Sequence, residues 1–270
     1  MRAGIFTASN KCGERGRFLD SRERLTAAAR GGETDRLPWF AWQPATDATA
    51  ALDHYRKWQP DALVVQSSQE VAELLAETSA AVLVEIDNPF GRAMQRGIDL
   101  NAEFDKGPSV GDAAFGGFVQ ETRLALASAI ESGADGVLYR VFGAEPSLST
   151  PMQFGGFYLE QERELLGEIT DARFNVVFVE GGEETYLDVV SDLPGNAFGW
   201  DEERNAVSAS TVRAMHQGAL ACGLHSEDPQ KLFASIGRLG LILSGKVVSL
   251  ADRDFGDVLA AAQSLAEASR

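Results

Sequence analysis

Cysteine is scarce in this chain of 270 residues, which contains only Cys12 and Cys222 and no CxxC pair. Two cysteines so far apart indicate reduced thiols rather than a disulfide framework or a thiolate zinc site. Long hydrophobic runs are missing too, since no apolar stretch reaches the roughly 18 residues that a membrane span needs. The first residues lack the apolar segment of a secretory signal, so we expect a cytoplasmic protein without a membrane partner.

Basic residues are outnumbered, with 24 Lys and Arg against 40 Asp and Glu, and the net charge is −16. A nucleic-acid-binding surface needs a basic footprint, so the charge argues against nucleic acid as a partner. The glycine-rich loops that bind nucleotide phosphates, G-x-G-x-x-G and G-x-x-x-x-G-K-[ST], are also absent. The partners that remain are a small-molecule substrate and, as an open alternative, a second copy of the chain in a homodimer.

The chain does contain a regular alternation of short apolar runs and amphipathic stretches. The candidate strands are Leu37–Trp42, Ala62–Gln66, Ala81–Asp87, Gly136–Phe142, Asn175–Glu180, Ala197–Asp201, Ala219–Leu224 and Leu239–Ser244. The helical stretches that follow them are about 47–58, 68–78, 113–133, 155–170, 184–192, 203–215, 227–237 and 254–268. Strands that alternate with helices indicate a parallel sheet, and eight such units predict a single α/β domain, a (β/α)8 TIM barrel.

The barrel domain is expected to span residues 20–270, after an N-terminal arm or cap at 1–19. The longest stretch without a pattern is Asn88–Asp112, which contains four glycines. Loops of this length in compact domains are usually functional or disordered. Because this one follows the third strand, we expect either a lid over the catalytic face or a flexible excursion.

Six short segments carry a further signal, beginning with the pattern R-E-R-L…A-A-x-R-G…D-R-x-P-W. They are Asp20–Trp42, Asn88–Gly91, Ile130–Tyr139, Val176–Leu187, Gly199–Glu203 and Cys222–Leu232. In this order they resemble segments of the uroporphyrinogen decarboxylase superfamily, which also contains corrinoid-dependent methyltransferases. The resemblance covers residues 20 to about 260. It implies a barrel with its active site at the carboxyl ends of the strands.

The residues that perform the superfamily's two known reactions are absent here. Its decarboxylases carry R-Q-A-G-R-Y after the first strand, where this chain has Trp42–Asp47 and no arginine. Their aspartate after the second strand falls at Gln66–Ser68. Its methyltransferases bind zinc through His and Cys at positions that are Phe178 and Glu180 here, and phenylalanine cannot ligate a metal. The resemblance therefore implies an inherited fold with altered chemistry.

Alternation of side chains along three neighbouring strands predicts a charged cavity. The apolar residues of the third strand must face the surrounding helices, so Glu85 and Asp87 point into the barrel. The same rule turns Arg140 and Glu180 inward on the next two strands. Buried carboxylates need partners, which these side chains can give each other. Further candidates follow the other strands: Trp42, Trp200, Asp201, His225 and Lys246.

Two roles are open to this group. In the catalytic interpretation, Arg140 clamps a carboxylate or phosphate of the substrate, and Asp87 or Glu180 transfers protons. The expected catalytic residues are Asp87, Glu180, Asp201 and His225. The expected substrate-binding residues are Arg140, Trp42, Glu85, Trp200 and Lys246. In the structural interpretation, Arg140 only forms salt bridges that fill the barrel.

No cofactor is assigned, and two are left open. A divalent metal could be held by oxygen-rich ligands drawn from Asp87, Glu180, Asp201 and His225. A corrinoid would fit the methyltransferase branch. Three hypotheses follow: an acid/base or lyase-type enzyme, with decarboxylation as one form, acting on a small polar or acidic metabolite; a zinc-less corrinoid-type methyltransferase; and a barrel without catalysis.

Overall fold

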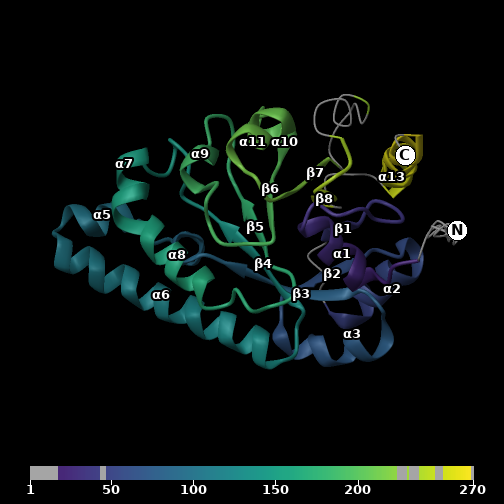
Figure 1. Cartoon of the computed structure of the whole chain (residues 1–270). Coiled ribbons are helices and arrows are strands. Elements are labelled where there is room, and N and C mark those ends of the chain that lie inside the picture. Colours follow the sequence, from purple (N-terminus) through teal and green to yellow (C-terminus); the bar gives the residue numbers. More distant parts are fainter. Residues whose placement is uncertain (1–17, 43–46, 224–229, 231–236, 247–251, 269–270) are drawn as a thin grey trace, which may run out of the picture.

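The computed structural model describes residues 18–42, 47–223, 230, 237–246 and 252–268, and all structural statements concern these. The strands form a closed parallel barrel in sequence order, in which β1 pairs with β8 (Figure 1). They are β1 (Trp39–Trp42), β2 (Ala62–Val65), β3 (Ala81–Asp87), β4 (Gly136–Val141), β5 (Val176–Val179), β6 (Ala197–Trp200), β7 (Ala219–Gly223) and β8 (Leu241–Lys246). The predicted (β/α)8 TIM barrel is therefore confirmed.

Helices surround the barrel (Figure 1). They are α1 (Ser21–Ala29), α2 (Ala48–Trp58), η1 (Ser68–Glu70), α3 (Val71–Glu77), α4 (Pro89–Gln95), α5 (Leu100–Asp105), α6 (Pro108–Glu131), α7 (Pro151–Gln153), η2 (Phe154–Tyr158), α8 (Leu159–Gly167), α9 (Leu187–Val190), α10 (Glu202–Asn205), α11 (Ala209–Met215) and α13 (Asp252–Ala268). No described helix is long and apolar enough to cross a membrane. The predicted arm at 1–19 and the predicted helix at 227–237 lie almost wholly outside the described residues.

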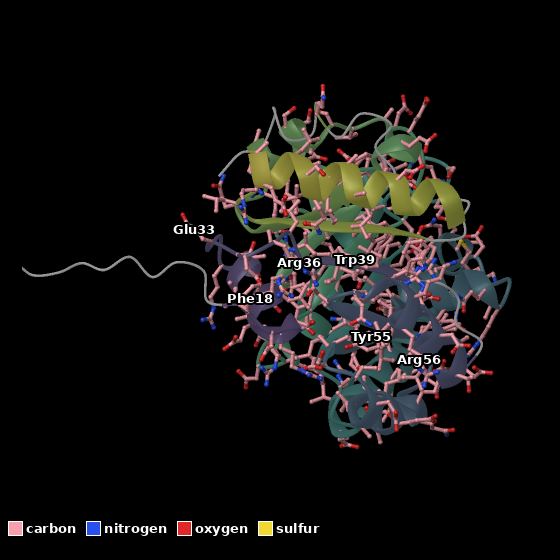
Figure 2. The ribbon with its side chains drawn as sticks, turned by 90° about the vertical axis from the view of Figure 1, so that its right-hand side faces the viewer. Phe18, Glu33, Arg36, Trp39, Tyr55 and Arg56 are labelled. Carbon is pink, nitrogen blue, oxygen red and sulfur yellow. The ribbon has the colours of Figure 1, made fainter. Side chains whose placement is uncertain are left out.

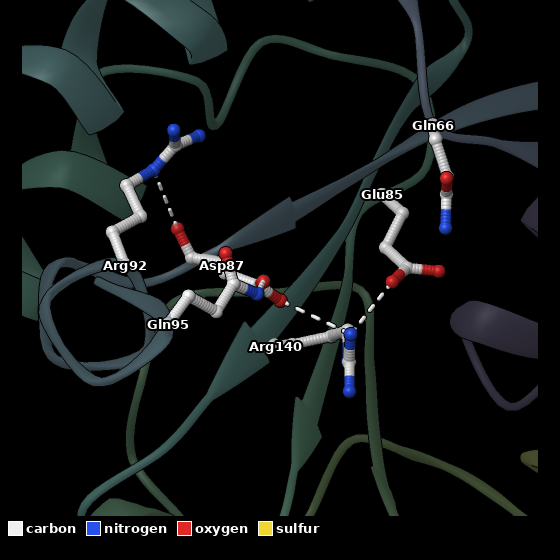
Figure 3. A pocket seen from close by; sticks show the side chains of 6 residues that line it. All are labelled: Gln66, Glu85, Asp87, Arg92, Gln95 and Arg140. Carbon is white, nitrogen blue, oxygen red and sulfur yellow. Dashed lines mark hydrogen bonds and ion pairs between the residues drawn. The ribbon is translucent and has the colours of Figure 1, made fainter. Parts of the chain in front are cut away.

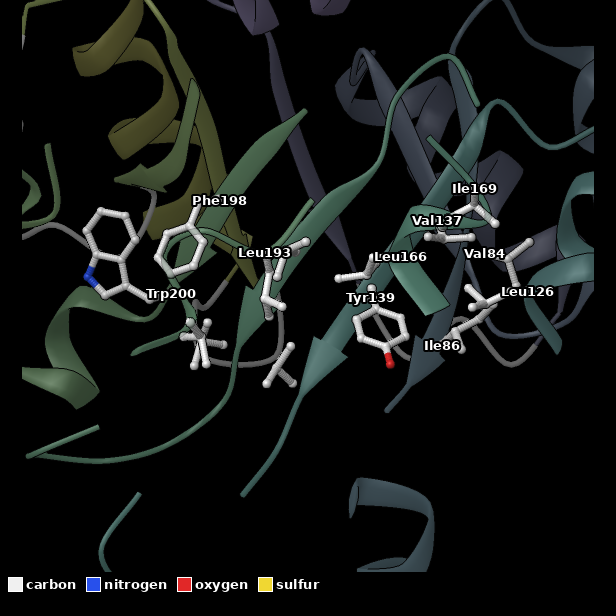
Figure 4. Close-up of a cluster of buried hydrophobic side chains, with 14 of the residues drawn as sticks. Val84, Ile86, Leu126, Val137, Tyr139, Leu166, Ile169, Leu193, Phe198 and Trp200 are labelled. Atoms are coloured by element: carbon white, nitrogen blue, oxygen red, sulfur yellow. The ribbon is translucent and has the colours of Figure 1, made fainter. Parts of the chain in front are cut away.

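Two faces of the strands build two separate apolar clusters. The outer cluster fills the space between the strands and the helices, as Figure 4 shows for Ile86 on β3 and Tyr139 on β4. The inner cluster fills the barrel and includes Leu83, Leu138 and Phe178. This alternation confirms the predicted orientation of β3, β4 and β5. It also points the polar residues at the carboxyl ends of these strands toward the barrel axis.

Helix α1 covers the amino-terminal end of the barrel. It starts with a capping box, in which the Glu23 amide donates to Asp20 at 2.7 Å and the Asp20 amide donates to Glu23 at 3.2 Å. Gly31 follows with φ of 66°, the left-handed conformation expected after a helix end. Leu25 is fully buried against the barrel interior. Helix α1 therefore closes the amino-terminal end of the barrel.

A buried carboxylate ties α1 to the barrel. Asp61 is fully buried and accepts hydrogen bonds from Arg24, from Arg36 at 2.7 Å and from the Trp39 amide at 3.0 Å. Figure 2 shows Arg36 and Trp39 below α13. The two arginines come from different segments, so this one aspartate holds α1 and the entry to β1 together.

Replacing Asp61 with alanine is expected to lower the free energy of unfolding by about 3–5 kcal/mol, because two arginines lose a buried counter-charge. Urea denaturation of the two proteins measures the difference. The matched control is Asp53→Ala, since Asp53 pairs with Arg56 on the surface at 3.0 Å. That exposed pair should contribute less than about 1 kcal/mol. Similar losses in the two variants would show that the Asp61 network does not stabilise the barrel.

The stretch Asn88–Asp112 is not irregular, and this sequence prediction is wrong. It forms α4, α5 and the start of α6. Asn88 and Asp99 cap the first two helices by accepting backbone hydrogen bonds at 2.8 and 3.1 Å. Gly97 and Gly107 have positive φ at the helix boundaries. These glycines separate short helices, which is the reason that they were mistaken for loop residues.

The last helix, α13, contacts the segment that leads into β1. The Leu37 amide donates to Gln263 Oε1 at 3.2 Å, and Gln263 Nε2 donates to the Leu37 carbonyl at 3.0 Å. Figure 2 shows α13 lying across the barrel beside β8. The two ends of the domain therefore meet at the point where the barrel closes.

Candidate functional site

A cavity of about 260 Å³ opens at the carboxyl ends of β2, β3 and β4. Polar and charged side chains line it, as Figure 3 shows: Gln66, Glu85, Asp87, Arg92, Gln95 and Arg140. Barrel enzymes build their active sites at this end, from residues that follow the strands. A cavity of this size is slightly below the usual range for drug-sized ligands and suits a small metabolite.

Arg140 lies at the centre of an ion-pair cluster. Its Nη1 donates to Glu85 Oε1 at 2.7 Å and lies 3.2 Å from Asp87 Oδ1. Its Nε and Nη2 contact Glu180 Oε1 at 2.9 and 2.8 Å. The structure therefore brings together all four residues that alternation placed inside the barrel. All are more than four-fifths buried, with side-chain exposures of 18% for the arginine and 7–13% for the carboxylates.

The environment keeps Arg140 charged. Burial by itself would lower the pKa of its guanidinium, but the charges of Glu180, Asp87 and Glu85 outweigh burial and raise it. The ring of Phe142 lies 4.8 Å from the guanidinium carbon and covers one face. Because its three nitrogens already contact carboxylates, Arg140 is engaged with its own chain. This contact pattern suits a residue that positions carboxylates better than one that clamps a substrate.

Asp87 has the most exposed side chain of the three carboxylates, at 13%. Its Oδ1 is buried and accepts no hydrogen bond, although Arg140 is nearby. Its Oδ2 contacts the amide of Gln95, and its backbone carbonyl accepts a hydrogen bond from Arg92 Nε at 3.1 Å. Orphaned buried oxygens are rare in proteins and call for a partner. A proton or a ligand hydroxyl would satisfy Asp87 Oδ1.

Two of the other predicted site residues, Trp200 and Asp201, do not join this cluster. Trp200 is 1% exposed, packs in the outer apolar cluster and donates to the Val207 carbonyl at 2.9 Å. It therefore faces the helices, and its expected place at the mouth is corrected. Asp201 caps α10 by accepting the Arg204 amide at 3.0 Å. Asp201 therefore starts α10 directly after β6 and does not line the cavity.

Three predicted residues cannot be placed by their side chains. His225 lies outside the described residues, and so do the side chains of Trp42 and Lys246. The backbones of the latter two are register partners at the ends of β1 and β8. Cys222, expected to be a reduced thiol, is 1% exposed, and burial raises the pKa of its thiol well above the usual value.

The expected oxygen-rich metal site is not assembled within the described part of the chain. No three His, Cys, Asp or Glu side chains there converge as metal ligands. Arg140 occupies the space among the carboxylates, and Asp201 serves as a helix cap. The described side chains therefore do not fit a divalent cation.

The sequence interpretation missed Arg92 and Gln95, which line the cavity from α4. It treated their segment as irregular, so it could not place them on a helix face. Asn88 as a cap, followed by Pro89, is a helix-start signal that would have predicted α4. Residues three apart on that helix share a face, which puts both side chains on the side of the cavity.

A buried polar group supports the cluster from the helix side of the strands. Glu162 on α8 is fully buried, accepts from Tyr139 at 2.5 Å and accepts from Asn88 Nδ2 at 2.8 Å. Tyr139 and Asn88 adjoin Arg140 and Asp87 in the chain. Burial raises the pKa of Glu162 to about 7, although both hydrogen bonds lower it. Glu162 thus holds the ends of β3 and β4 while titrating near neutral pH.

The raised pKa of Glu162 predicts a loss of stability as pH rises. The folded protein binds this proton more tightly than the unfolded chain, so the free energy of unfolding falls between about pH 4.5 and 7. Glu162→Gln should remove up to about 2–3 kcal/mol of that fall, measured by urea denaturation across pH. In this variant a weaker dependence of stability on pH should remain, because burial also raises the pKa of Glu202 to about 7.

The control for this prediction is Glu160→Gln on the same helix. Glu160 is 73% exposed and pairs with Arg163 at 3.3 Å, so its removal should leave the pH profile unchanged. A profile for Glu162→Gln that matches the native protein would show that Glu162 contributes nothing to the pH dependence.

The fold and the site together define a (β/α)8 barrel with ionisable groups at the carboxyl ends of its strands. Among solved structures, it is similar to a methyltransferase from Methanosarcina mazei, with a TM-score of 0.73 and 12% identity, covering 92% of this chain and 99% of that one. A tryptophan synthase from M. tuberculosis has a TM-score of 0.45 and 11% identity, covering 93% and 100%. No family model and no curated protein matches the sequence. The first likeness supports the barrel fold and leaves the chemistry undetermined.

Proposed function

We propose that this protein is a barrel enzyme with the uroporphyrinogen decarboxylase-like fold that performs acid/base or lyase-type chemistry on a small polar metabolite. The observation that carries the proposal is the cluster of three carboxylates around Arg140 beside a cavity at the carboxyl end of the barrel. Burying charged groups is costly, and such clusters in clefts are favoured where they do chemistry.

Each member of the cluster has a role in this proposal. Asp87 transfers the proton, through the Oδ1 that has no hydrogen bond. Arg140 positions Asp87 and Glu85 through its ion pairs with both carboxylates. In a proton abstraction, Asp87 accepts the proton from a carbon or oxygen of the substrate. In a decarboxylation, the carbon–carbon bond to the leaving CO2 breaks and its electron pair stays on the substrate carbon. That carbon then takes a proton from protonated Asp87, which regains a proton from solvent.

The test is a search for ligands followed by proton exchange. A thermal-shift screen of small polar metabolites should raise the unfolding midpoint with at least one compound class, since ligands that bind the folded state stabilise it. Proton NMR in D2O then follows the hits, and a carbon-bound hydrogen that exchanges only with enzyme supports the proposal. No exchange and no turnover with any stabilising compound would instead favour the non-catalytic barrel.

The likeness to a methyltransferase supports a second candidate, a zinc-less corrinoid-type methyltransferase. Phe178 is buried in the inner cluster and Glu180 pairs with Arg140, so the described strand β5 offers no soft zinc ligand. Titration with methylcobalamin, followed by its visible absorbance, separates this candidate from the first. A saturable spectral change would favour methyl transfer, and no change would favour the first candidate.

A further inference from the structure

Two guanidinium groups line the cavity, and their contacts differ. Arg140 contacts carboxylates through all three of its nitrogens. Arg92 uses only Nε, which donates to the Asp87 carbonyl at 3.1 Å. Its Nη1 and Nη2 make no hydrogen bond or ion pair with the residues that the structure describes. The cavity therefore has one cation committed to the protein and one available to a ligand.

The available guanidinium is already oriented. Its Nε contact fixes the plane of the group, so less conformational entropy is lost when a ligand binds. A planar fork with two free nitrogens matches a carboxylate, which it binds through two parallel charge-assisted hydrogen bonds. Arg92 is half-buried near the start of α4. The residue that caps this helix, Asn88, directly follows the last residue of β3. It is thus a recognition group held by the same strand end as Asp87.

Gln66 provides a second contact point. It follows β2, lines the cavity and makes no hydrogen bond with the described residues. In Figure 3 it lies on one side of Glu85, while Arg92 lies beyond Asp87 on the other. A carboxamide both donates and accepts, so it can pair with a hydroxyl, oxo or amino group. The proposed proton-transfer residue lies between the two.

We infer that the substrate is a small monocarboxylic acid with a hydroxyl, oxo or amino substituent. Arg92 binds its carboxylate, and Gln66 binds the substituent, so that the carbon between them faces Asp87. This inference rests on the proposed function and names its substrate class. A diacid is disfavoured, because Arg140 is occupied and a second carboxylate would lie near Asp87. The arginine predicted from the sequence to clamp the substrate is thereby replaced by Arg92.

Isothermal titration calorimetry tests the inference with lactate, pyruvate and alanine as monoacids, malate as a diacid and lactamide as a neutral analogue. At least one monoacid should bind the native protein more tightly than malate and lactamide do. Arg92→Gln should weaken that binding by about 10- to 100-fold, the range expected for charged hydrogen bonds. The control is Arg96→Gln, one turn away, because Arg96 pairs with Glu121 on the surface and does not line the cavity.

The outcomes separate this inference from the proposed function. Unchanged binding in Arg92→Gln, equal weakening in Arg96→Gln, or no binding of any monoacid would overturn the role of Arg92. If a neutral ligand undergoes proton exchange and Arg92→Gln does not change its rate, the role of Arg92 is rejected and the proposed function is kept. Loss of carboxylate binding in Arg92→Gln without any exchange would keep the recognition site and reject the function. Circular dichroism checks that each variant folds. If Arg92→Gln does not fold, Arg92→Lys is used in its place and is expected to weaken binding about tenfold.

Discussion

Replacing Arg140 with alanine is expected to lower the free energy of unfolding by about 3–5 kcal/mol. Three carboxylates would remain at the mouth without the guanidinium that contacts them at 2.7–3.2 Å. Their repulsion is strong because all three are largely buried, where charges are poorly screened. Urea denaturation at pH 8 measures the loss.

Two further variants make this result specific. Arg140→Lys keeps the charge but has one nitrogen for three carboxylates, so it should lose less stability than the alanine variant. Arg204→Ala should change stability by less than about 1 kcal/mol, because this exposed arginine only approaches Glu180 to 3.9 Å. If Arg140→Ala is as stable as the native protein, the cluster does not depend on this arginine and its positioning role is rejected.

Replacing Asp87 with asparagine is expected to lower kcat by about 10²–10⁴-fold on any substrate that the screen identifies. The substitution keeps the shape of the side chain and its contact with Gln95, but it removes the group that accepts the proton. The rate of hydrogen exchange or turnover, measured at saturating substrate, reports the loss. KM should change far less, because Arg92 and Gln66 are unaffected.

The control is Asp99→Asn, an equally small change at the cap of α5, since asparagine also caps helices. Its kcat should equal that of the native enzyme. A rate for Asp87→Asn within about threefold of the native rate would exclude Asp87 as the proton-transfer residue. Glu85→Gln as the more damaging variant would move that role to Glu85.

Alternation along the strands predicted much of this site from sequence. On β3 the outer positions are apolar, so Glu85 and Asp87 had to face the barrel, and the inner cluster confirms this. The same rule applied to β6 would have placed Trp200 outside, because Ala197 three residues earlier faces inward. The error arose because Trp200 was assigned to the mouth from its position at the end of the strand, without regard to which face alternation gives it.

What the sequence could not provide is the pairing of charges. Parity shows that Arg140 points into the barrel, but its contacts depend on the register of β4 against both neighbours. In that register Asp87 is level with Arg140, and Glu180 follows the adjacent strand, so the arginine is surrounded. The free cation, Arg92, comes from a helix whose start was overlooked. The proposed substrate-binding role therefore moved from Arg140 to Arg92.

A crystal structure with the strongest carboxylate ligand of the screen would test the central claim most directly. The claim predicts ligand density in the cavity, with the carboxylate about 3 Å from Arg92 Nη1 and Nη2 and a neighbouring atom close to Asp87 Oδ1. Density for the ligand elsewhere on the protein, with the Arg140 ion pairs intact and the cavity occupied only by water, would contradict it.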